Sequence, residues 1–432
     1  MLKQDIPSLA ENLYSERVED RLLVINPRVG KGITLLGKRS EMILNLINGR
    51  DSILSIAASL GEPTDDMVMA IKTLADKEIV IVPGYSPKPR PASKPSMRVW
   101  VHTSDLCNLA CRYPCYISSM TGKKMSVETG RLMVDSISES LVAHPNYAKQ
   151  VVFVLAGGEP LLNFDVVKDI TTYAKSKLAE INIETQCNIL SNGTIFSKQI
   201  ADFVLSQECG FSVSLDGLGE YNNARVFKSG RSSVEMVIKN IEKFRNVGVK
   251  PFILVTVSST NLNGLLDLTK YLVENNLGFR YSLVRQPVTG ENSSSSENEI
   301  ISALAQCYDY MESAVATSAR PPSGRFETIS SQTKTIRGCA VGSKYITVDT
   351  SGMVHLCQTL LGVSEPIANI DTSDLFGSTL ITGKFNNFPT TYTMSSCSKC
   401  QWSYMCGAGC PLLNISNGGN PTRSPYCNIY RY

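Results

Sequence analysis

The segment RVWVHTSDLCNLACRYPCY, residues 98–116, joins an apolar run to a loop that carries three cysteines. The apolar run at 98–103 is typical of a buried strand. Cys107, Cys111 and Cys115 follow it directly, and loops after the carboxyl ends of parallel strands carry the reactive groups in barrel folds. Three thiolates on one loop can bind three irons of a 4Fe–4S cube. The fourth iron would then be open to a substrate or cofactor, as an open position on zinc is.

Five more apolar segments follow this first one, and amphipathic segments separate them. Strands that alternate with helices predict a parallel sheet covered by helices, which is an α/β fold. The pattern leaves open whether the sheet curves into a partial barrel or stays open and doubly wound. The six predicted strands are residues 98–103, 151–156, 184–190, 211–215, 252–257 and 279–284.

A second group of cysteines closes the chain and reads C-x12-G-x4-C, a gap, C-x2-C-x5-C-x3-C, a gap, and C. Together with the first loop, this grouping favours soft-metal chemistry over disulfides. A zinc ribbon is the alternative, but it would need two close cysteine pairs, and only Cys397 and Cys400 have x2 spacing. The seven cysteines are Cys339, Cys357, Cys397, Cys400, Cys406, Cys410 and Cys427.

Composition narrows the class of protein further. The 432 residues have room for two or three domains, and 43% hydrophobic residues suffice for a sizeable core. A net charge of +3 gives no strong field for nucleic acid or an anionic membrane. The N-terminus lacks an apolar signal core, and no apolar run reaches membrane-spanning length, so we expect a cytoplasmic protein. Cys187, Cys209 and Cys307 lie outside both groups and are expected to be plain buried thiols.

Residues 85–96 are rich in proline, lysine and serine, which predicts a linker after a first domain at 1–84. In that domain, residues 21–37 predict a hairpin, and three helical segments follow. Gly49 and Gly61 stand where helices should end. The result is a winged-helix-like unit. DNA binding or simple packing are alternatives, although the acidic start of the third helix suits phosphates poorly.

The three-cysteine loop resembles the radical S-adenosylmethionine (SAM) superfamily, whose usual pattern is C-x3-C-x2-C. Here the spacing is C-x3-C-x3-C, and Pro114 is most simply the added residue. The insertion moves Tyr113, the match for the aromatic residue that packs near the adenine. Four further matches stand at strand ends in the family's order: GGEP at 157–160, SNGT at 191–194, SLDG at 214–217, and TVS at 256–258.

This resemblance implies a partial (β/α)6 barrel with SAM bound at the strand ends. The GGEP loop would meet the amino group of SAM, Asn192 the ribose, and Ser214 with Arg225 the carboxylate. For Arg225, a surface ion pair is the alternative. The residues implied to contact SAM are Tyr113, Gly157, Gly158, Glu159, Ser191, Asn192, Ser214, Arg225, Ser258 and Leu283.

The tail resembles the SPASM domain, an auxiliary iron–sulfur module of peptide-modifying radical enzymes, and it matches cysteine for cysteine. The resemblance implies one cluster on Cys397, Cys400, Cys406 and Cys427, and another on Cys339, Cys357 and Cys410. Sulfatase maturases in this group carry a basic Asp directly after the second tail cysteine. Gln358 stands there and cannot accept a proton at neutral pH, which disfavours that reaction.

As a whole, the chain resembles maturases of ribosomally synthesised, post-translationally modified peptides. Residues 1–84 resemble a RiPP recognition element, the domain that binds leader peptides, with the leader expected on 18–84. Residues 97–325 would form the radical SAM core and 326–432 the SPASM domain. The cofactors implied are three 4Fe–4S clusters and SAM, and the partners a precursor peptide and an electron donor such as flavodoxin or ferredoxin.

The implied reaction cleaves SAM to a 5′-deoxyadenosyl radical, which removes hydrogen from the core peptide. Crosslinking, thioether formation and tyrosine-fragment excision all stay open, and no catalytic acid, base or hydrogen donor can be assigned. One alternative is a leader-binding iron–sulfur scaffold that does not cleave SAM. The other is a radical SAM enzyme for a small molecule, in which residues 1–84 serve only packing.

Overall fold

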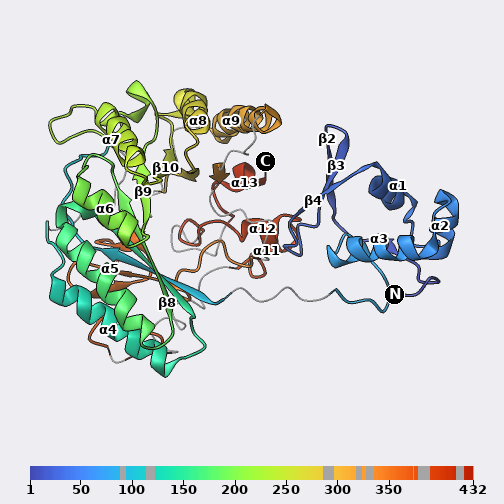
Figure 1. Cartoon of the computed structure of the whole chain (residues 1–432), viewed down its shortest axis with the longest axis horizontal. Coiled ribbons are helices and arrows are strands. Elements are labelled where there is room, and N and C mark those ends of the chain that lie inside the picture. The colour runs from blue at the N-terminus through green and yellow to red at the C-terminus, as the bar shows by residue number, and fades with distance from the viewer. Residues whose placement is uncertain are drawn as a thin grey trace.

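The computed structural model shows a small N-terminal domain beside a larger α/β body, with the C-terminal tail between them (Figure 1). The predictions for Tyr113, Pro114 and Cys115 lie outside the described residues. The structure describes residues 1–87, 94–112, 122–285, 296–317, 324–326, 335–372, 374–377, 390–414 and 423–431.

The first domain contains the predicted hairpin and the three helices that follow it. A third strand precedes the hairpin, so the antiparallel sheet has the order β2-β3-β4 and its first strand begins before residue 18. A short strand pair closes the domain beside the third helix. The elements are β1 (Ser8–Leu9), β2 (Tyr14–Val18), β3 (Arg21–Ile25), β4 (Ile33–Leu36), α1 (Lys38–Leu46), α2 (Ile53–Leu60), α3 (Thr64–Asp76) and β5 (Val80–Ile81).

This domain has its own apolar core, built from the sheet and the inner faces of the helices. Ile43, Ile53 and Ile71 are fully buried there, one from each helix. The second helix has local start and stop signals. The Ser52 hydroxyl accepts a hydrogen bond from the Ser55 amide at its start, and Gly61 adopts left-handed φ of 65° at its end.

The six predicted strands all form, and they are parallel neighbours in chain order. A doubly wound sheet reverses its strand order at a switch point, and this sheet does not. Side chains from β6 through β11 line one common cavity, so the sheet curves around it as a partial barrel. The strands are β6 (Ser96–His102), β7 (Gln150–Ala156), β8 (Glu184–Ser191), β9 (Gly210–Ser214), β10 (Phe252–Val257) and β11 (Phe279–Leu283).

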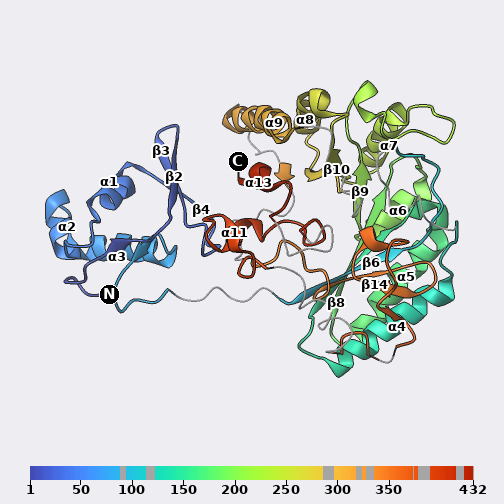
Figure 2. The ribbon, with the colours of Figure 1, turned by 180° about the vertical axis from the view of Figure 1, so that it is seen from behind.

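Helices cover the outer face of this curved sheet (Figures 1 and 2). Side chains alternate along each strand, so Val99 and Val101 are fully buried in the main apolar core, while Arg98 and Trp100 line the inner cavity. The helices are α4 (Val127–Ala143), α5 (Phe164–Ala179), α6 (Lys198–Ser206), α7 (Val234–Asn246), α8 (Leu265–Glu274) and α9 (Glu297–Thr317), with 3-10 turns at η2 (Pro160–Asn163), η3 (Gly219–Asn222) and η4 (Leu262–Gly264).

The C-terminal residues extend the same sheet, which the loop-rich composition did not reveal. Strand β13 pairs in parallel with β6, and two antiparallel strands continue beyond it. At the opposite edge, β12 pairs with β11. The elements are β12 (Gly324–Phe326), β13 (Tyr345–Val348), β14 (Met353–His355), η5 (Gln358–Leu360), β15 (Ala368–Asn369), α11 (Ser395–Ser398), α12 (Ser403–Cys406) and α13 (Cys427–Arg431).

Two of the three cysteines outside the groups are buried, Cys187 and Cys307, while Cys209 is half-buried. Within the described ranges, no helix combines the length and apolar character that a membrane crossing needs. The residues that the sequence predicts to bind SAM and metal lie at the carboxyl ends of the barrel strands and in the tail.

Candidate functional site

The cysteine loop leaves β6 and is fixed to a neighbouring segment by its backbone. The Ala110 amide donates a hydrogen bond to the Val226 carbonyl at 2.7 Å, and the Arg112 amide donates one to the Ala224 carbonyl at 2.7 Å. Cys107 and Cys111 are both half-buried on this loop. The loop therefore runs beside the segment that carries Arg225, one of the predicted SAM contacts.

Cys107 sits between donors from its own loop and from the end of β8. Its sulfur accepts hydrogen bonds from the Leu109 amide at 3.4 Å and from the Asn192 side chain at 3.7 Å. Burial raises the pKa of Cys107, and these two donors oppose that effect. Such donors stabilise a thiolate, the form that binds metal.

The Gly157-Gly158 pair after β7 lies directly against the cysteine loop. The Gly158 amide donates to the Ser104 carbonyl at 2.7 Å, and the Glu159 amide donates to the Leu106 carbonyl at 2.9 Å. A Cβ on Gly158 would stand 2.3 Å from the Leu106 oxygen. From the sequence, we expected these glycines to let the backbone come close to a ligand. In the structure, they also let it come close to the cysteine loop.

Glu159 is fully buried and ties β7 to β8. One carboxylate oxygen accepts from the Leu161 amide at 3.1 Å and the Ser191 hydroxyl at 2.9 Å. The other accepts from the Asn192 amide at 2.7 Å. Burial raises the pKa of Glu159 to about 7 despite these three donors. The structure shows that Glu159 links the ends of β7 and β8 by hydrogen bonds. Its contact with SAM stays a prediction.

Asn192 belongs to a buried side-chain network that reaches the cysteine loop. Its side-chain nitrogen donates to Asn108 at 2.8 Å, and its oxygen accepts from both the amide and the hydroxyl of Thr194. Asn108 donates in turn to the Thr194 hydroxyl at 2.8 Å. Sequence reasoning missed Asn108, although its place directly after Cys107 was a usable signal.

Arg225 forms a buried ion pair with Asp216. Its Nε lies 2.6 Å from the carboxylate, and the two side chains are 12% and 2% exposed. Asp216 also accepts from the Thr256 amide at 2.8 Å. Arg225 therefore does form an ion pair, but the pair is buried and not on the surface as the alternative reading expected. The sequence did not single out its partner, Asp216. Ser214 ends β9 two residues before this pair.

The last predicted contacts stand at the ends of the neighbouring strands β10 and β11. The Ser258 amide donates to the Asn261 side chain at 2.9 Å, which fixes the turn after β10. Leu283 is buried and pairs with Val257 across the two strands. The described members of the predicted SAM site thus gather at one edge of the sheet, beside the cysteine loop.

The seven tail cysteines divide between two cavities. We call the first the barrel cavity; it measures about 550 Å³ and lies inside the curved sheet. We call the second the tail cavity; it measures about 440 Å³. Cys339, Cys357 and Cys410 line the barrel cavity, and Cys397, Cys400, Cys406 and Cys427 line the tail cavity. These are the two sets that the resemblance implied.

The pKa values of the tail cysteines also reflect these two sets, because a thiol's pKa is raised by the other cysteines of its own set. The pKa of Cys357 is raised to about 11, mainly by burial and in smaller part by the nearby Cys410 and Cys339. Burial raises the pKa of Cys406 to about 12, with added effects of Cys427 and Cys397. Each of these two thiols is therefore close to members of its own set.

A left-handed turn explains how Cys410 leaves the cavity that Cys406 lines. Gly407, Ala408 and Gly409 have φ angles of 60°, 67° and 72°, so three successive residues lie in the left-handed region. The Asn414 side chain holds the turn by donating to the Ala408 carbonyl at 2.7 Å. This turn redirects the chain from the tail cavity to the barrel cavity within four residues.

The thiols of each tail set line a cavity. A zinc ion needs its ligands within about 2.0–2.3 Å. In the part of the chain that the structure describes, no three His, Cys, Asp or Glu side chains are arranged for one metal ion. Thiolates around an iron–sulfur cube would stand farther apart than the ligands of a single zinc ion.

Gln358 lines the barrel cavity next to Cys357. Its side-chain oxygen accepts hydrogen bonds from the Tyr345 hydroxyl at 2.6 Å and from the Cys357 thiol at 3.3 Å. The side chain is therefore fixed at the cavity wall as a hydrogen-bond acceptor, without the charge of the Asp that sulfatase maturases carry there.

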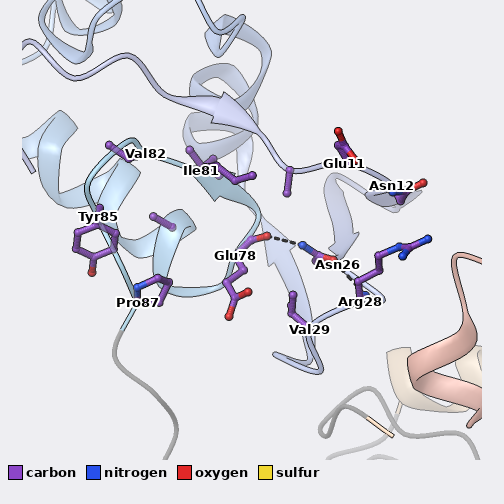
Figure 3. Close-up of a pocket in the computed structure, with 13 residues that line it drawn as sticks. Glu11, Asn12, Asn26, Arg28, Val29, Glu78, Ile81, Val82, Tyr85 and Pro87 are labelled. Carbon is purple, nitrogen blue, oxygen red and sulfur yellow. Dashed lines mark hydrogen bonds between the residues drawn. The ribbon is translucent and has the colours of Figure 1, made fainter. Parts of the chain in front are cut away.

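The first domain meets the tail close to these thiols. The Tyr14 ring packs against Trp402 with a centroid distance of 5.1 Å, and Trp402 lies between Cys400 and Cys406 in sequence. Asn12 lines the tail cavity and also a pocket of about 480 Å³ within the first domain (Figure 3). That pocket is bordered by Arg28, Glu78 and Tyr85.

Comparison with known proteins relates this geometry to a family. Residues 101–270 match the model of the Radical SAM superfamily. An uncharacterised protein of Methanocaldococcus jannaschii is 29% identical over 167 residues, which are 39% of this chain and 55% of that protein. A serine-type anaerobic sulfatase-maturating enzyme of Klebsiella pneumoniae is 24% identical over 339 residues, 75% of this chain and 84% of that enzyme.

Solved structures extend the likeness in fold to nearly the whole chain. Native anSMEcpe with bound AdoMet superposes with a TM-score of 0.65 at 20% identity, over 78% of this chain and 95% of that one. Streptococcus suis SuiB bound to precursor peptide SuiA gives a TM-score of 0.58 at 15% identity, over 98% of this chain and 99% of that one. The second match includes the first domain and the tail as well as the barrel.

Proposed function

We propose that this chain, a radical SAM enzyme with its matching domain at residues 101–270, modifies a ribosomally made peptide that it recognises by a leader. The observation that carries the proposal is the division of seven tail cysteines between two cavities, one of which lies inside the barrel. In the SPASM domain that the tail resembles, two such sets of cysteines bind auxiliary clusters, and this domain is typical of peptide-modifying radical enzymes. SuiB, whose fold matches 98% of this chain, is bound to a precursor peptide in its structure.

Enzymes of this superfamily use a 4Fe–4S cluster and SAM, which together supply a radical that abstracts hydrogen. We assign the first cluster to Cys107, Cys111 and Cys115, and SAM to the strand ends beside them. Gly157 and Gly158 hold the cysteine loop at a fixed distance from β7. Asn192 holds it to β8. The work of these residues is to position the loop and to exclude water from it.

Residues 1–84 are the proposed leader-binding domain. The outer strand β4 pairs only with β3 in the described residues and leaves Ile33 and Leu35 about half exposed. An edge strand with exposed apolar side chains suits a peptide that adds as a further strand. Binding there would raise the effective concentration of the core peptide at the barrel.

The tail cavity suits the proposed electron donor. Lys399, Arg423 and Arg431 line it with exposed side chains, and none of its described lining residues is Asp or Glu. A basic rim around a four-thiol site attracts an acidic redox protein, such as flavodoxin or ferredoxin, by charge complementarity. Sulfatase maturation is not proposed, because Gln358 replaces the base.

Anaerobic reconstitution with iron, sulfide, SAM and dithionite tests this proposal. We expect release of 5′-deoxyadenosine, and a mass change in the peptide encoded by a neighbouring short reading frame. A preparation that binds iron but releases no 5′-deoxyadenosine, even with that peptide, would instead support the leader-binding scaffold. Removal of residues 1–84 addresses the other alternative, since unchanged substrate affinity would indicate a small molecule.

A further inference from the structure

A closed ring of three side-chain hydrogen bonds joins the end of β8 to the cysteine loop. The Asn192 nitrogen donates to the Asn108 oxygen at 2.8 Å, and the Asn108 nitrogen donates to the Thr194 hydroxyl at 2.8 Å. That hydroxyl donates to the Asn192 oxygen at 2.6 Å and closes the ring. Asn192 and Thr194 are 6% and 7% exposed. Hydrogen bonds linked in this way inside a protein strengthen one another, so we expect the ring to be rigid.

A single backbone group determines the orientation of both side-chain amides. The Thr194 amide donates to the Asn192 side chain at 3.0 Å. A backbone amide can only donate, so the atom of Asn192 that it meets has to be the oxygen, and the nitrogen has to face the cysteine loop. The atom of Asn108 that meets this nitrogen then has to be an oxygen as well. The direction of every bond in the ring follows.

All hydrogen-bonding positions of the Asn192 side chain are occupied by protein atoms. Its nitrogen has two hydrogens, of which one points to Asn108 and the other to the Cys107 sulfur, 3.7 Å away. Its oxygen has two lone pairs, which accept from the amide and the hydroxyl of Thr194. A ribose hydroxyl of SAM could therefore bind to Asn192 only if one of these four bonds broke.

The bond to the Cys107 sulfur gives the ring a chemical effect. The Leu109 amide donates to the same sulfur at 3.4 Å, so two donors converge on it. Hydrogen bonds to the ligating sulfurs are one of the factors that set the reduction potential of an iron–sulfur cluster. They stabilise negative charge on sulfur, and the reduced cluster carries one more negative charge than the oxidised one. A donor held at Cys107 therefore favours reduction.

We propose that Asn192 is a positioning residue for Cys107 and not a ribose contact. The ring with Asn108 and Thr194 holds its amide against the sulfur, fixes the cysteine loop to β8 and makes the cluster on that loop easier to reduce. The proposal rests on the proposed function, because it requires that Cys107 binds a cluster. The ribose of SAM is then bound by other groups at the strand ends.

Redox titration of the reconstituted full-length protein, followed by electron paramagnetic resonance, tests the effect on the cluster. The signal of the first cluster is the one that changes when SAM is added. Thr194→Val removes one hydroxyl and opens the ring, although Thr194 neither contacts Cys107 nor belongs to the predicted SAM contacts. We expect reduction to become about threefold to tenfold less favourable, and tenfold corresponds to about 59 mV for one electron.

Two matched variants show whether the hydroxyl itself is responsible. Thr194→Ser keeps the hydroxyl and should restore the wild-type potential. Thr185→Val makes the same substitution near the start of β8, where the Thr185 hydroxyl is buried and has no hydrogen-bond partner in the described part of the chain. This control should leave the potential unchanged.

Calorimetric titration with SAM and with its 2′-deoxy and 3′-deoxy analogues tests the second part of the proposal. For each analogue, the ratio of its dissociation constant to that of SAM measures what the missing hydroxyl contributes. In Asn192→Ala we expect the ratios of the wild type within about twofold, since no ribose bond is lost. A fall of about fivefold or more in either ratio would mean that Asn192 binds the ribose, and would overturn the proposal.

Two further results would overturn it. One is a wild-type potential and iron content in Thr194→Val, and the other is a shift of equal size in Thr194→Ser or Thr185→Val. Loss of the first cluster from Thr194→Val but not from Thr194→Ser would support the positioning role. Release of 5′-deoxyadenosine by the wild-type preparation shows separately whether the proposed radical chemistry stands.

Discussion

Single residues position the cysteine loop through contacts too close for any side chain. Gly157 has a φ of 146°, and a Cβ there would lie 2.4 Å from the Ser104 oxygen. Gly158 makes a similar approach to Leu106. Because the neighbouring atoms belong to the backbone, they cannot turn aside as a flexible side chain could. The geometry of the loop that carries Cys107 therefore depends on the absence of a Cβ at these positions.

Gly158→Ala should displace the cysteine loop. We expect a loss of about 1–3 kcal/mol in stability, the usual effect of overpacking, and loss of the iron held by Cys107 and its neighbours. Thermal unfolding and iron analysis under anaerobic conditions measure both. Gly37→Ala is the matched control, since a Cβ there meets nothing within 4 Å, and it should change stability by less than about 0.5 kcal/mol. Equal iron content in the two variants would contradict the steric argument.

The sequence was informative wherever a residue acts through its own type and spacing. The resemblance to the SPASM domain, which the cysteine spacing carries, implied the two tail sets, and the strand ends indicated where Asn192 and Ser258 lie. It was less informative where a residue acts through a distant partner. The pairing of Arg225 with Asp216 depends on the turn after β9, and nothing in their separation of nine residues shows it.

Among the elements, the tail owes its position to strand β13. Ile346 and Val348 are fully buried in the main core, and β13 pairs with β6 over four residues. Sequence patterns gave the six barrel strands because each is a near-continuous apolar run between turn signals. They did not indicate this pairing, because its partners lie 247 residues apart in the chain and parallel pairing leaves no local turn signal.

The turn at Gly407–Gly409 predicts that the two tail sets load independently. Cys357→Ala should remove about four irons, one cube, and Cys397→Ala should remove about four others. The double variant should lose about eight. Iron analysis and electron paramagnetic resonance of reduced samples measure these losses. The control is Cys187→Ala, which replaces a buried thiol outside both sets, and this variant should keep the iron content of the wild type. A double variant with no greater loss than either single one would show that the seven cysteines share one cluster.

At the scale of the whole molecule, the first domain lies beside the C-terminal tail (Figures 1 and 2). At this junction the Tyr14 ring packs on Trp402, and Asn12 lines the tail cavity. Asn12 also lines the pocket of the first domain (Figure 3). If the first domain binds a leader as proposed, the bound leader would lie close to the tail.

Tyr14→Ala should loosen this junction without unfolding either part. An aromatic pair contributes about 0.5–1.5 kcal/mol beyond its buried area, so the ratio of docked to undocked domains should fall about twofold to tenfold. Hydrogen exchange of the amides at 400–406, which carry Trp402 and two tail-cavity cysteines, should quicken by the same factor while the iron content stays constant. Met69→Ala is the control, because Met69 is 69% exposed on α3 of the same domain. Unchanged exchange in Tyr14→Ala would mean that the first domain docks on the tail by other contacts, and that Trp402 is held by the tail alone.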